Sequence, residues 1–120
     1  MRNIYFNFFL PLEFFLSAVN EKNGYWEYLW DNGQVYFKGN WKKGLMHGDW
    51  QSYYPTGRLL GAGCYKNGLR DGKFSSYHDN GNLECEGSFK DGKRIGSWKF
   101  YNNNGCLSKE ENYKDENYLK

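Results

Sequence analysis

Histidine and cysteine side chains are where this sequence could bind a metal or carry out acid–base or nucleophilic chemistry. The two histidines, His47 and His78, have no cysteine or acidic neighbour at a spacing typical of metal ligands. The three cysteines, Cys64, Cys85 and Cys106, lie 21 residues apart, and an odd number at this spacing indicates neither a zinc site nor a disulfide framework. We therefore expect no metal, and we interpret the thiols as reduced packing or surface residues.

Three further motifs lack the surroundings that catalysis or cofactor binding needs. Ser75-Ser76 does not lie in a strand–turn–helix nucleophile motif, and Gly61-Ala62-Gly63 is too short for a phosphate-binding loop. Glu84 and Glu86 would share the polar face of a strand, where paired carboxylates are usually just solvated. We therefore predict that the chain is not an enzyme and needs no cofactor.

A period of 24 residues organises nearly everything after about residue 24. A turn glycine, a large aromatic residue, an aliphatic residue and a second aromatic residue all recur in this register: Gly33, Gly57, Gly81 and Gly105; Trp26, Trp50, Phe74 and Trp98; Val35, Leu59, Leu83 and Leu107; and Trp41, Tyr65, Phe89 and Tyr113. A repeat of this length predicts a solenoid-like array of stacked units. We place an N-terminal segment at residues 1–23 and four repeats at 24–47, 48–71, 72–95 and 96–120.

The composition favours short strands joined by glycine turns. The chain has 15 glycines against 2 prolines, 21% of its residues are aromatic, and no window keeps a helical period. Its formal net charge of +2 argues against nucleic acid or an anionic membrane as a strongly electrostatic partner. A lysine follows the second aromatic residue of each repeat, and we interpret this row as a solvated edge: Lys42, Lys66, Lys90 and Lys114.

The third repeat indicates how one unit folds. Asn80-Gly81 separates two short strand-like runs, and this dipeptide favours a type I′ hairpin turn, in which both central residues have positive φ. With these two residues as the loop, the strands pair Phe74 with Gly87, Ser76 with Cys85, and His78 with Leu83.

Large rings are expected to lie opposite glycines in the first three hairpins. The same register pairs Trp26 with Gly39 and Trp50 with Gly63. Glycine leaves room for a ring over bare backbone, and the ring shields the hydrogen bonds there. The fourth repeat departs from this rule, and we expect fraying or capping at the C-terminal end because Trp98 would face Glu111.

Alternation along the strands gives the predicted sheet two different faces. We call the first the tryptophan face, and in this register it collects both the large aromatic and the aliphatic positions: Trp26, Trp50, Phe74, Trp98, Val35, Leu59, Leu83 and Leu107. The opposite face is polar except for one row, and we call it the tyrosine face after that row: Leu29, Tyr53, Tyr77 and Tyr101.

A second glycine turn is expected between hairpins. Each of these turns would open at one pair of residues (Lys43-Gly44, Asn67-Gly68 or Asp91-Gly92) and close at another (His47-Gly48, Asp71-Gly72 or Ile95-Gly96). The predicted fold is all-β: a repeat array of antiparallel β-hairpins that form a single elongated, twisted meander sheet of about eight strands.

Residues 4–16 form the most apolar run of the chain, and two interpretations remain open. The run follows Arg2 and precedes Ser17-Ala18, which is the outline of a secretory signal that would export the chain through residues 1–18. The interpretation we favour is a cap on the first repeat in a cytoplasmic protein. A cap would pack Phe8, Phe9, Phe14 or Phe15 against the exposed rings of the first hairpin.

The recurring residues resemble the MORN repeat, most closely the bacterial variant of the YwqK-type antitoxins. The similarity covers about residues 24–114 and is carried by three stretches: Gly48-Asp49-Trp50 through Tyr65-Lys66-Asn67-Gly68, Gly72 through Phe89-Lys90-Asp91-Gly92, and Gly96 through Gly105. The last copy departs from the pattern at Lys109, Glu111 and Glu116. The resemblance implies a β-hairpin array that binds proteins, dimerises or contacts phospholipid, and the antitoxin variant implies neutralising a toxin by binding it.

Two functions from different classes follow from these features. The first is a protein-binding antitoxin or immunity module whose partner is a protein, such as a toxin encoded nearby. Its contact surface would include Tyr53, Tyr77 and Tyr101 with Arg58 and Lys99, because tyrosine and arginine are typical interface anchors. The alternative is an exported envelope or surface scaffold with lipid contact.

Overall fold

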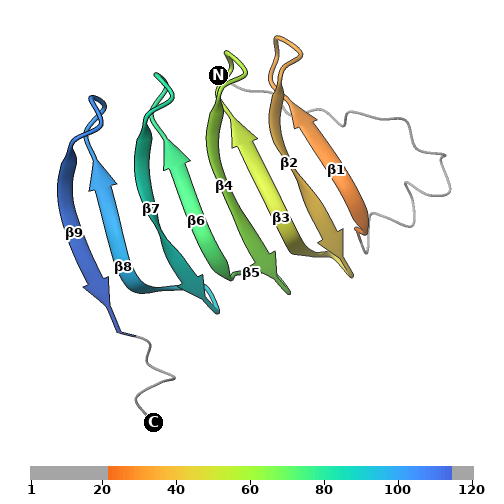
Figure 1. Cartoon of the computed structure of the whole chain (residues 1–120). Coiled ribbons are helices and arrows are strands. Elements are labelled where there is room, and N and C mark those ends of the chain that lie inside the picture. The colour runs from red at the N-terminus through yellow and green to blue at the C-terminus, as the bar shows by residue number, and fades with distance from the viewer. Residues whose placement is uncertain (1–21, 115–120) are drawn as a thin grey trace, which may run out of the picture.

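The computed structural model describes residues 22–114, which form one antiparallel β-sheet (Figure 1). The strands are β1 (Gly24–Leu29), β2 (Val35–Lys42), β3 (Leu45–Tyr53), β4 (Leu59–Lys66), β5 (Leu69–Arg70), β6 (Gly72–Tyr77), β7 (Leu83–Lys90), β8 (Lys93–Tyr101) and β9 (Leu107–Tyr113). Eight of them lie side by side in chain order, and the two-residue β5 pairs with β4. This order confirms the predicted all-β meander, and the ninth strand arises because Asp71 separates β5 from β6, both of which pair with β4.

All regular secondary structure in the described part of the chain is strand, and no helix there is long and apolar enough to cross a membrane. The predicted cap and the signal-like interpretation both rest on residues 1–18, which lie outside the described residues.

Tight two-residue turns join each hairpin to the next, and all of them lie at the same end of the strands (Figure 1). Both residues of each turn have positive φ: 51° and 79° for Lys43-Gly44, 51° and 86° for Asn67-Gly68, and 51° and 83° for Asp91-Gly92. The flanking residues pair directly, as Lys42 does with Leu45. These are type I′ turns, and they lie between the hairpins rather than inside them.

The turns inside the hairpins are one residue longer than predicted. In the third repeat, the His78 amide donates to the Asn82 carbonyl at 2.8 Å and the Gly81 amide donates to the His78 carbonyl at 2.9 Å. Gly81 has a φ of 94°, whereas Asn80 keeps a negative φ, so the predicted type I′ turn is wrong. The Oδ1 atom of Asn80 instead accepts the Asn82 amide at 2.9 Å, which favours a three-residue loop closed by a glycine bulge.

The longer loop moves the aliphatic row to the other face of the sheet. Tyr77 pairs with Leu83 and Ser76 pairs with Cys85, so Glu84 is an extra residue in β7, and His78 does not face Leu83 as predicted. The other three hairpins shift register at the equivalent place. Residues paired directly across a ladder share a face, so the aliphatic row lies on the tyrosine face and the prediction for it was wrong: Val35, Leu59, Leu83 and Leu107.

Glu84 changes face for the same reason. Its carboxylate accepts the Ser76 hydroxyl at 3.0 Å and lies 4.0 Å from Nδ1 of His78. Ser76 and His78 alternate with Tyr77 and therefore point to the tryptophan face. Glu84 lies with them, and the prediction that it shares a face with Glu86 is corrected.

Three glycines expected to close the second turns lie in strands instead. Gly48 is inside β3 with a φ of 93°, Gly96 is inside β8 with a φ of 69°, and Gly72 begins β6 with a φ of 97°. Pairing is irregular next to Gly48 and Gly96, where β2 shifts against β3 and β7 shifts against β8. Positive φ at these points bends the strands, and the sheet is therefore curved rather than flat.

The strand pairs between rings and glycines are those predicted, but the packing over the glycines differs. Trp50 lies over Gly63, its hairpin partner, as expected. Gly87 pairs with Phe74, yet the ring packed on it is that of Trp98 from the next hairpin. At the fourth copy, Glu111 occupies the position of these glycines and faces Trp98 as predicted.

Trp98 is the centre of the best-buried cluster rather than a frayed end. Its side chain is 0% exposed and packs edge-on against Phe89 with ring centroids 4.9 Å apart. Its Nε1 donates to the Ser88 carbonyl at 3.1 Å, and Cys85 is buried in the same cluster. The tryptophan face therefore carries the core of this single-layer sheet, and the tyrosine face is the more open one.

Candidate functional site

A row of large side chains crosses the tyrosine face from one end of the sheet to the other. We call it the tyrosine–leucine row, and each of the eight long strands contributes one member: Leu29, Val35, Tyr53, Leu59, Tyr77, Leu83, Tyr101 and Leu107. All are half-buried except Leu107, which is 54% exposed. The sequence pattern identified the four members on the first strand of each hairpin and missed their aliphatic partners on the second strand, because it did not reveal the bulge.

Two tyrosines of this row, Tyr53 and Tyr101, are held in place by neighbouring polar groups. The Tyr53 hydroxyl donates to Oε1 of Gln51 at 2.9 Å, and Nζ of Lys38 lies 5.4 Å from the centroid of its ring. The Tyr101 hydroxyl donates to Oε2 of Glu86 at 3.1 Å. Desolvation and this bond raise the pKa of Tyr101 above its ordinary value. The rings are therefore oriented before a partner binds, which lowers the entropic cost of association.

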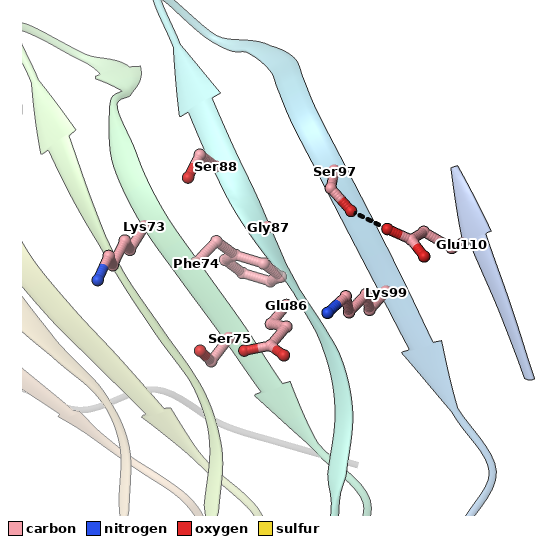
Figure 2. Close-up of a pocket in the computed structure, with 9 residues that line it drawn as sticks. All are labelled: Lys73, Phe74, Ser75, Glu86, Gly87, Ser88, Ser97, Lys99 and Glu110. Atoms are coloured by element: carbon pink, nitrogen blue, oxygen red, sulfur yellow. Dashed lines mark hydrogen bonds between the residues drawn. The ribbon is translucent and has the colours of Figure 1, made fainter. Parts of the chain in front are cut away.

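A groove of about 500 Å³ lies on the same face, next to the carboxylate that holds Tyr101 (Figure 2). Lys99 and Glu86 lie directly across from each other between β8 and β7, and both line the groove. On the side of the groove toward β9, Ser97 donates to Glu110, and on the side toward β6 the groove is lined by Lys73. The groove therefore presents charges of both signs beside the tyrosine–leucine row.

The repeat builds the same groove a second time, two repeats earlier. This groove has a volume of about 370 Å³ and is lined at the equivalent positions by Lys38 in place of Glu86 and Gln51 in place of Lys99. The backbone thus supplies a hollow at a fixed position in the repeat, and the side chains give each hollow its own charge pattern.

Arg58 is the one predicted contact residue that lies away from the tyrosine–leucine row. It follows the turn between β3 and β4, where its Nη1 donates to the Asp79 carbonyl in the next turn at 3.4 Å. The structure therefore brings Lys99 and Tyr101 together through Glu86 and keeps Tyr53 and Tyr77 in the same row. Arg58 lies apart from them, at the end of the strands where the turns inside the hairpins lie side by side, which we call the turn edge.

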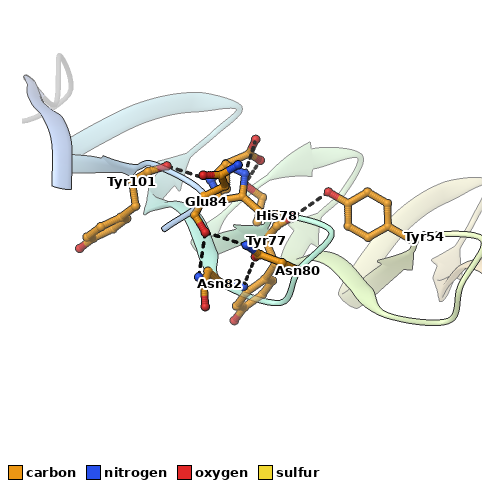
Figure 3. Close-up of polar contacts among 9 residues, drawn as sticks. Tyr54, Tyr77, His78, Asn80, Asn82, Glu84 and Tyr101 are labelled. Carbon is orange, nitrogen blue, oxygen red and sulfur yellow. Dashed lines mark hydrogen bonds and ion pairs between the residues drawn. The ribbon is translucent and has the colours of Figure 1, made fainter. Parts of the chain in front are cut away.

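The turn edge is tied together by side chains that reach from one repeat to the next (Figure 3). Trp30, Tyr54 and His78 occupy one position of the repeat, and each donates to the backbone carbonyl 23 residues later, at 3.0, 2.7 and 2.8 Å. Asn80 similarly donates to the Asn103 carbonyl. His78 therefore has a structural role: its Nε2 is protonated and donates a hydrogen bond to the backbone carbonyl of Tyr101.

The polar cluster around His78 is not arranged for nucleophilic catalysis. Ser76 donates to Glu84 rather than to the histidine, and Nε2 of His78 is occupied by the Tyr101 carbonyl. Ser76 therefore lacks the hydrogen bond to a histidine base that activates the nucleophile in a Ser–His pair. Among residues 22–114, no three His, Cys, Asp or Glu side chains are grouped so that they could hold a metal.

A set of cations on the tryptophan face was missed by the sequence analysis. Arg70 lies over Phe89 and Phe74 with its Cζ atom 5.2 and 5.3 Å from the ring centroids, and Arg94 lies 4.7 Å from that of Trp98. Both occupy one position of the 24-residue period, so the spacing itself could have revealed them.

The repeating hairpins identify the family. Three segments match the family model of the MORN repeat variant: residues 46–67, 70–91 and 94–115. The chain belongs to the MORN repeat variant family. Each MORN segment spans one hairpin, and β1 and β2 form a further hairpin of the same pairing before them. MORN repeats are generally binding modules without catalytic activity and typically bind proteins or lipids.

No curated protein matches this MORN chain.

Proposed function

We propose that the chain is a protein-binding antitoxin that neutralises a toxin encoded nearby, and that the tyrosine face contacts it. The observation that supports this is the tyrosine–leucine row, which places an aromatic or aliphatic side chain on each of eight adjacent strands. Protein interfaces combine such an apolar centre with a polar rim. The charged groove beside Tyr101 supplies part of that rim.

A protein suits this face better than a lipid surface. Lys73 and Lys99 share the groove with Glu86 and Glu110, so the face is not predominantly cationic. Anionic membranes favour clusters of basic residues without acidic neighbours. Tyrosine adds a hydroxyl to a large apolar ring, which makes it a frequent anchor residue in protein interfaces.

The neutralising role rests on the resemblance of the repeats to the antitoxin variant and needs no chemistry from the chain. A module that binds a toxin tightly lowers the concentration of free toxin by mass action alone.

Co-expression with the product of the neighbouring gene tests the proposal. The two proteins should co-purify, and the chain should restore growth of cells that the neighbour inhibits. Y77S should weaken the complex at least about tenfold, as expected of an anchor residue. An exposed lysine at a turn offers a matched control for the groove: K99E should weaken the complex, whereas K66E should not. A neighbour that neither binds nor inhibits growth would refute the antitoxin role.

The alternative is export as an envelope scaffold, and the observation in its favour is the signal-like outline of residues 1–18. We propose a cytoplasmic location instead, because Asn7, Pro11 and Glu13 interrupt the apolar run. Mass spectrometry of the N-terminus in cells decides between the two. A chain that begins at Met1 or Arg2 supports the cytoplasmic proposal, and cleavage after about residue 18 supports export.

A further inference from the structure

Arg70 and Arg94 bring positive charge to the aromatic tryptophan face. Arg70 is half-buried and Arg94 is exposed, so both guanidinium groups remain accessible from solvent. Within residues 22–114, neither guanidinium has a carboxylate at ion-pair distance. Two adjacent repeats therefore each present a cation that has no direct carboxylate partner in the described sheet.

The hydrogen bonds of the two arginines go to tyrosine hydroxyls. Nε of Arg70 donates to Tyr65 at 3.4 Å, and Nη1 of Arg94 donates to Tyr113 at 3.1 Å. Tyr113 in turn donates to Glu111 at 2.7 Å, so one carboxylate reaches Arg94 through the tyrosine. Arg70 has no such relay among the described residues, which makes it the more available cation of the two.

Met46 shows that the fold does not require a cation at this position. The residues that occupy this position, 24 apart along the chain, are Lys22, Met46, Arg70 and Arg94. Met46 pairs with Trp41 as Arg70 pairs with Tyr65 and Arg94 with Phe89. A neutral thioether thus fills the position at Met46, and packing alone does not explain the charges at Arg70 and Arg94.

We propose that Arg70 and Arg94 form a second binding surface, on the tryptophan face, that takes the carboxylates of an acidic protein segment. Equivalent positions of adjacent repeats are two strands, or about 10 Å, apart, so the carboxylates would be spaced to match. A guanidinium fork pairs bidentately with a carboxylate, and the rings beneath keep it in place. This surface is separate from the tyrosine face and does not depend on the antitoxin proposal.

An acidic segment fits this face better than an anionic membrane. Glu84 and Glu111 point to the same face, and their carboxylates would be repelled by a continuous layer of anionic headgroups. A segment with a few spaced carboxylates can meet Arg70 away from Glu111, and only the carboxylate that meets Arg94 comes near Glu111, to which Arg94 is linked through Tyr113. The charge pattern therefore selects a discrete acidic ligand.

Fluorescence anisotropy with a labelled peptide of alternating glutamate and glycine tests the proposal. R70M should weaken binding about tenfold, the effect of losing one charge-assisted hydrogen-bonded pair, and R94M should weaken it less. K66M removes the same charge from an exposed turn residue and should leave the affinity within about twofold. Binding should also weaken as salt is raised.

Three further measurements distinguish binding at the arginines from a loss of packing, from membrane binding and from binding at the tyrosine face. R70M should unfold within about 3 °C of the wild type, since Met46 is tolerated at the equivalent position; if it unfolds early, R70Q replaces it as the charge-removal variant. Y77S should bind the acidic peptide as the wild type does, so the two binding proposals can fail separately. Wild-type affinity in R70M or R70Q, equal loss in K66M, or Arg70-dependent binding to phosphatidylserine vesicles without peptide binding would overturn the proposal.

Discussion

The indole of Trp98 lies so close to the backbone of Gly87 that a Cβ atom there would be 2.2 Å from its Cδ2 atom. The two residues belong to β8 and β7, so this contact joins the third repeat to the fourth. The indole is 0% exposed and its Nε1 is bonded to the Ser88 carbonyl, so it cannot move aside without losing packing and a hydrogen bond. Glycine is required here for space, because its φ is not positive.

G87A should therefore be among the most destabilising single substitutions in the sheet. We expect a loss of about 3 kcal/mol in the free energy of unfolding, the upper part of the usual range for overpacking a core. G63A is the matched control, because a Cβ there would lie 3.0 Å from Nε1 of Trp50 and needs a smaller adjustment. Urea denaturation measures both, and equal losses in the two variants would show that the Trp98 contact is not special.

K43N should stabilise the chain. Lys43 has a φ of 51° in the first type I′ turn, where Asn67 and Asp91 hold the equivalent positions. The left-handed conformation is costly for lysine and is better tolerated by asparagine, so we expect a gain of about 0.5–1 kcal/mol. N67K makes the reverse change in the next turn and should cost a similar amount. Thermal unfolding of both variants should shift the midpoint in opposite directions.

Y54F tests the hydrogen bonds that tie one turn to the next. The Tyr54 hydroxyl donates to the Tyr77 carbonyl at 2.7 Å, and its loss leaves a partly buried acceptor unpaired. The expected cost is about 1 kcal/mol. Y53F removes a hydroxyl that bonds only to Gln51 of the same strand, and it should cost less than about 0.5 kcal/mol. If both variants unfold at the same urea concentration, the turn-edge bonds contribute little to stability.

The three free thiols should react with iodoacetamide in the order of their exposure. Cys106 is exposed, Cys64 is half-buried and Cys85 is buried. Desolvation raises the pKa of both Cys64 and Cys85, so less of each is thiolate at a given pH. Peptide mapping after brief labelling at pH 8 should find Cys106 modified first and Cys85 last. Raising the pH should speed the two slower thiols, and early labelling of Cys85 would mean that the cluster around Trp98 opens readily.

The strand pairing was predictable because glycines and rings recur at fixed spacing. The pairs of Trp50 with Gly63 and Phe74 with Gly87 follow from the period and from alternation along strands. The tyrosine positions of the candidate surface followed in the same way. These features depend only on the distance along the chain from a turn glycine, which a repeated sequence shows directly.

The turn type and the aliphatic row were not predictable by the same route. Asn80-Gly81 and Asn67-Gly68 are the same dipeptide, yet only the second is a type I′ turn. The difference arises because the Asn80 side chain accepts the Asn82 amide and donates to Asn103, a contact that exists only when another repeat lies beside it. One residue of difference in loop length then sends Leu83 to the opposite face.

Glu111 decides where the array can grow. It stands at the position of Gly39 and Gly87, where the first strand of the following hairpin places Trp50 and Trp98 against bare backbone. A side chain at residue 111 occupies the space that such a tryptophan would need. A further hairpin that placed a tryptophan at this position would therefore pack against β9 only if a small residue such as glycine replaced Glu111.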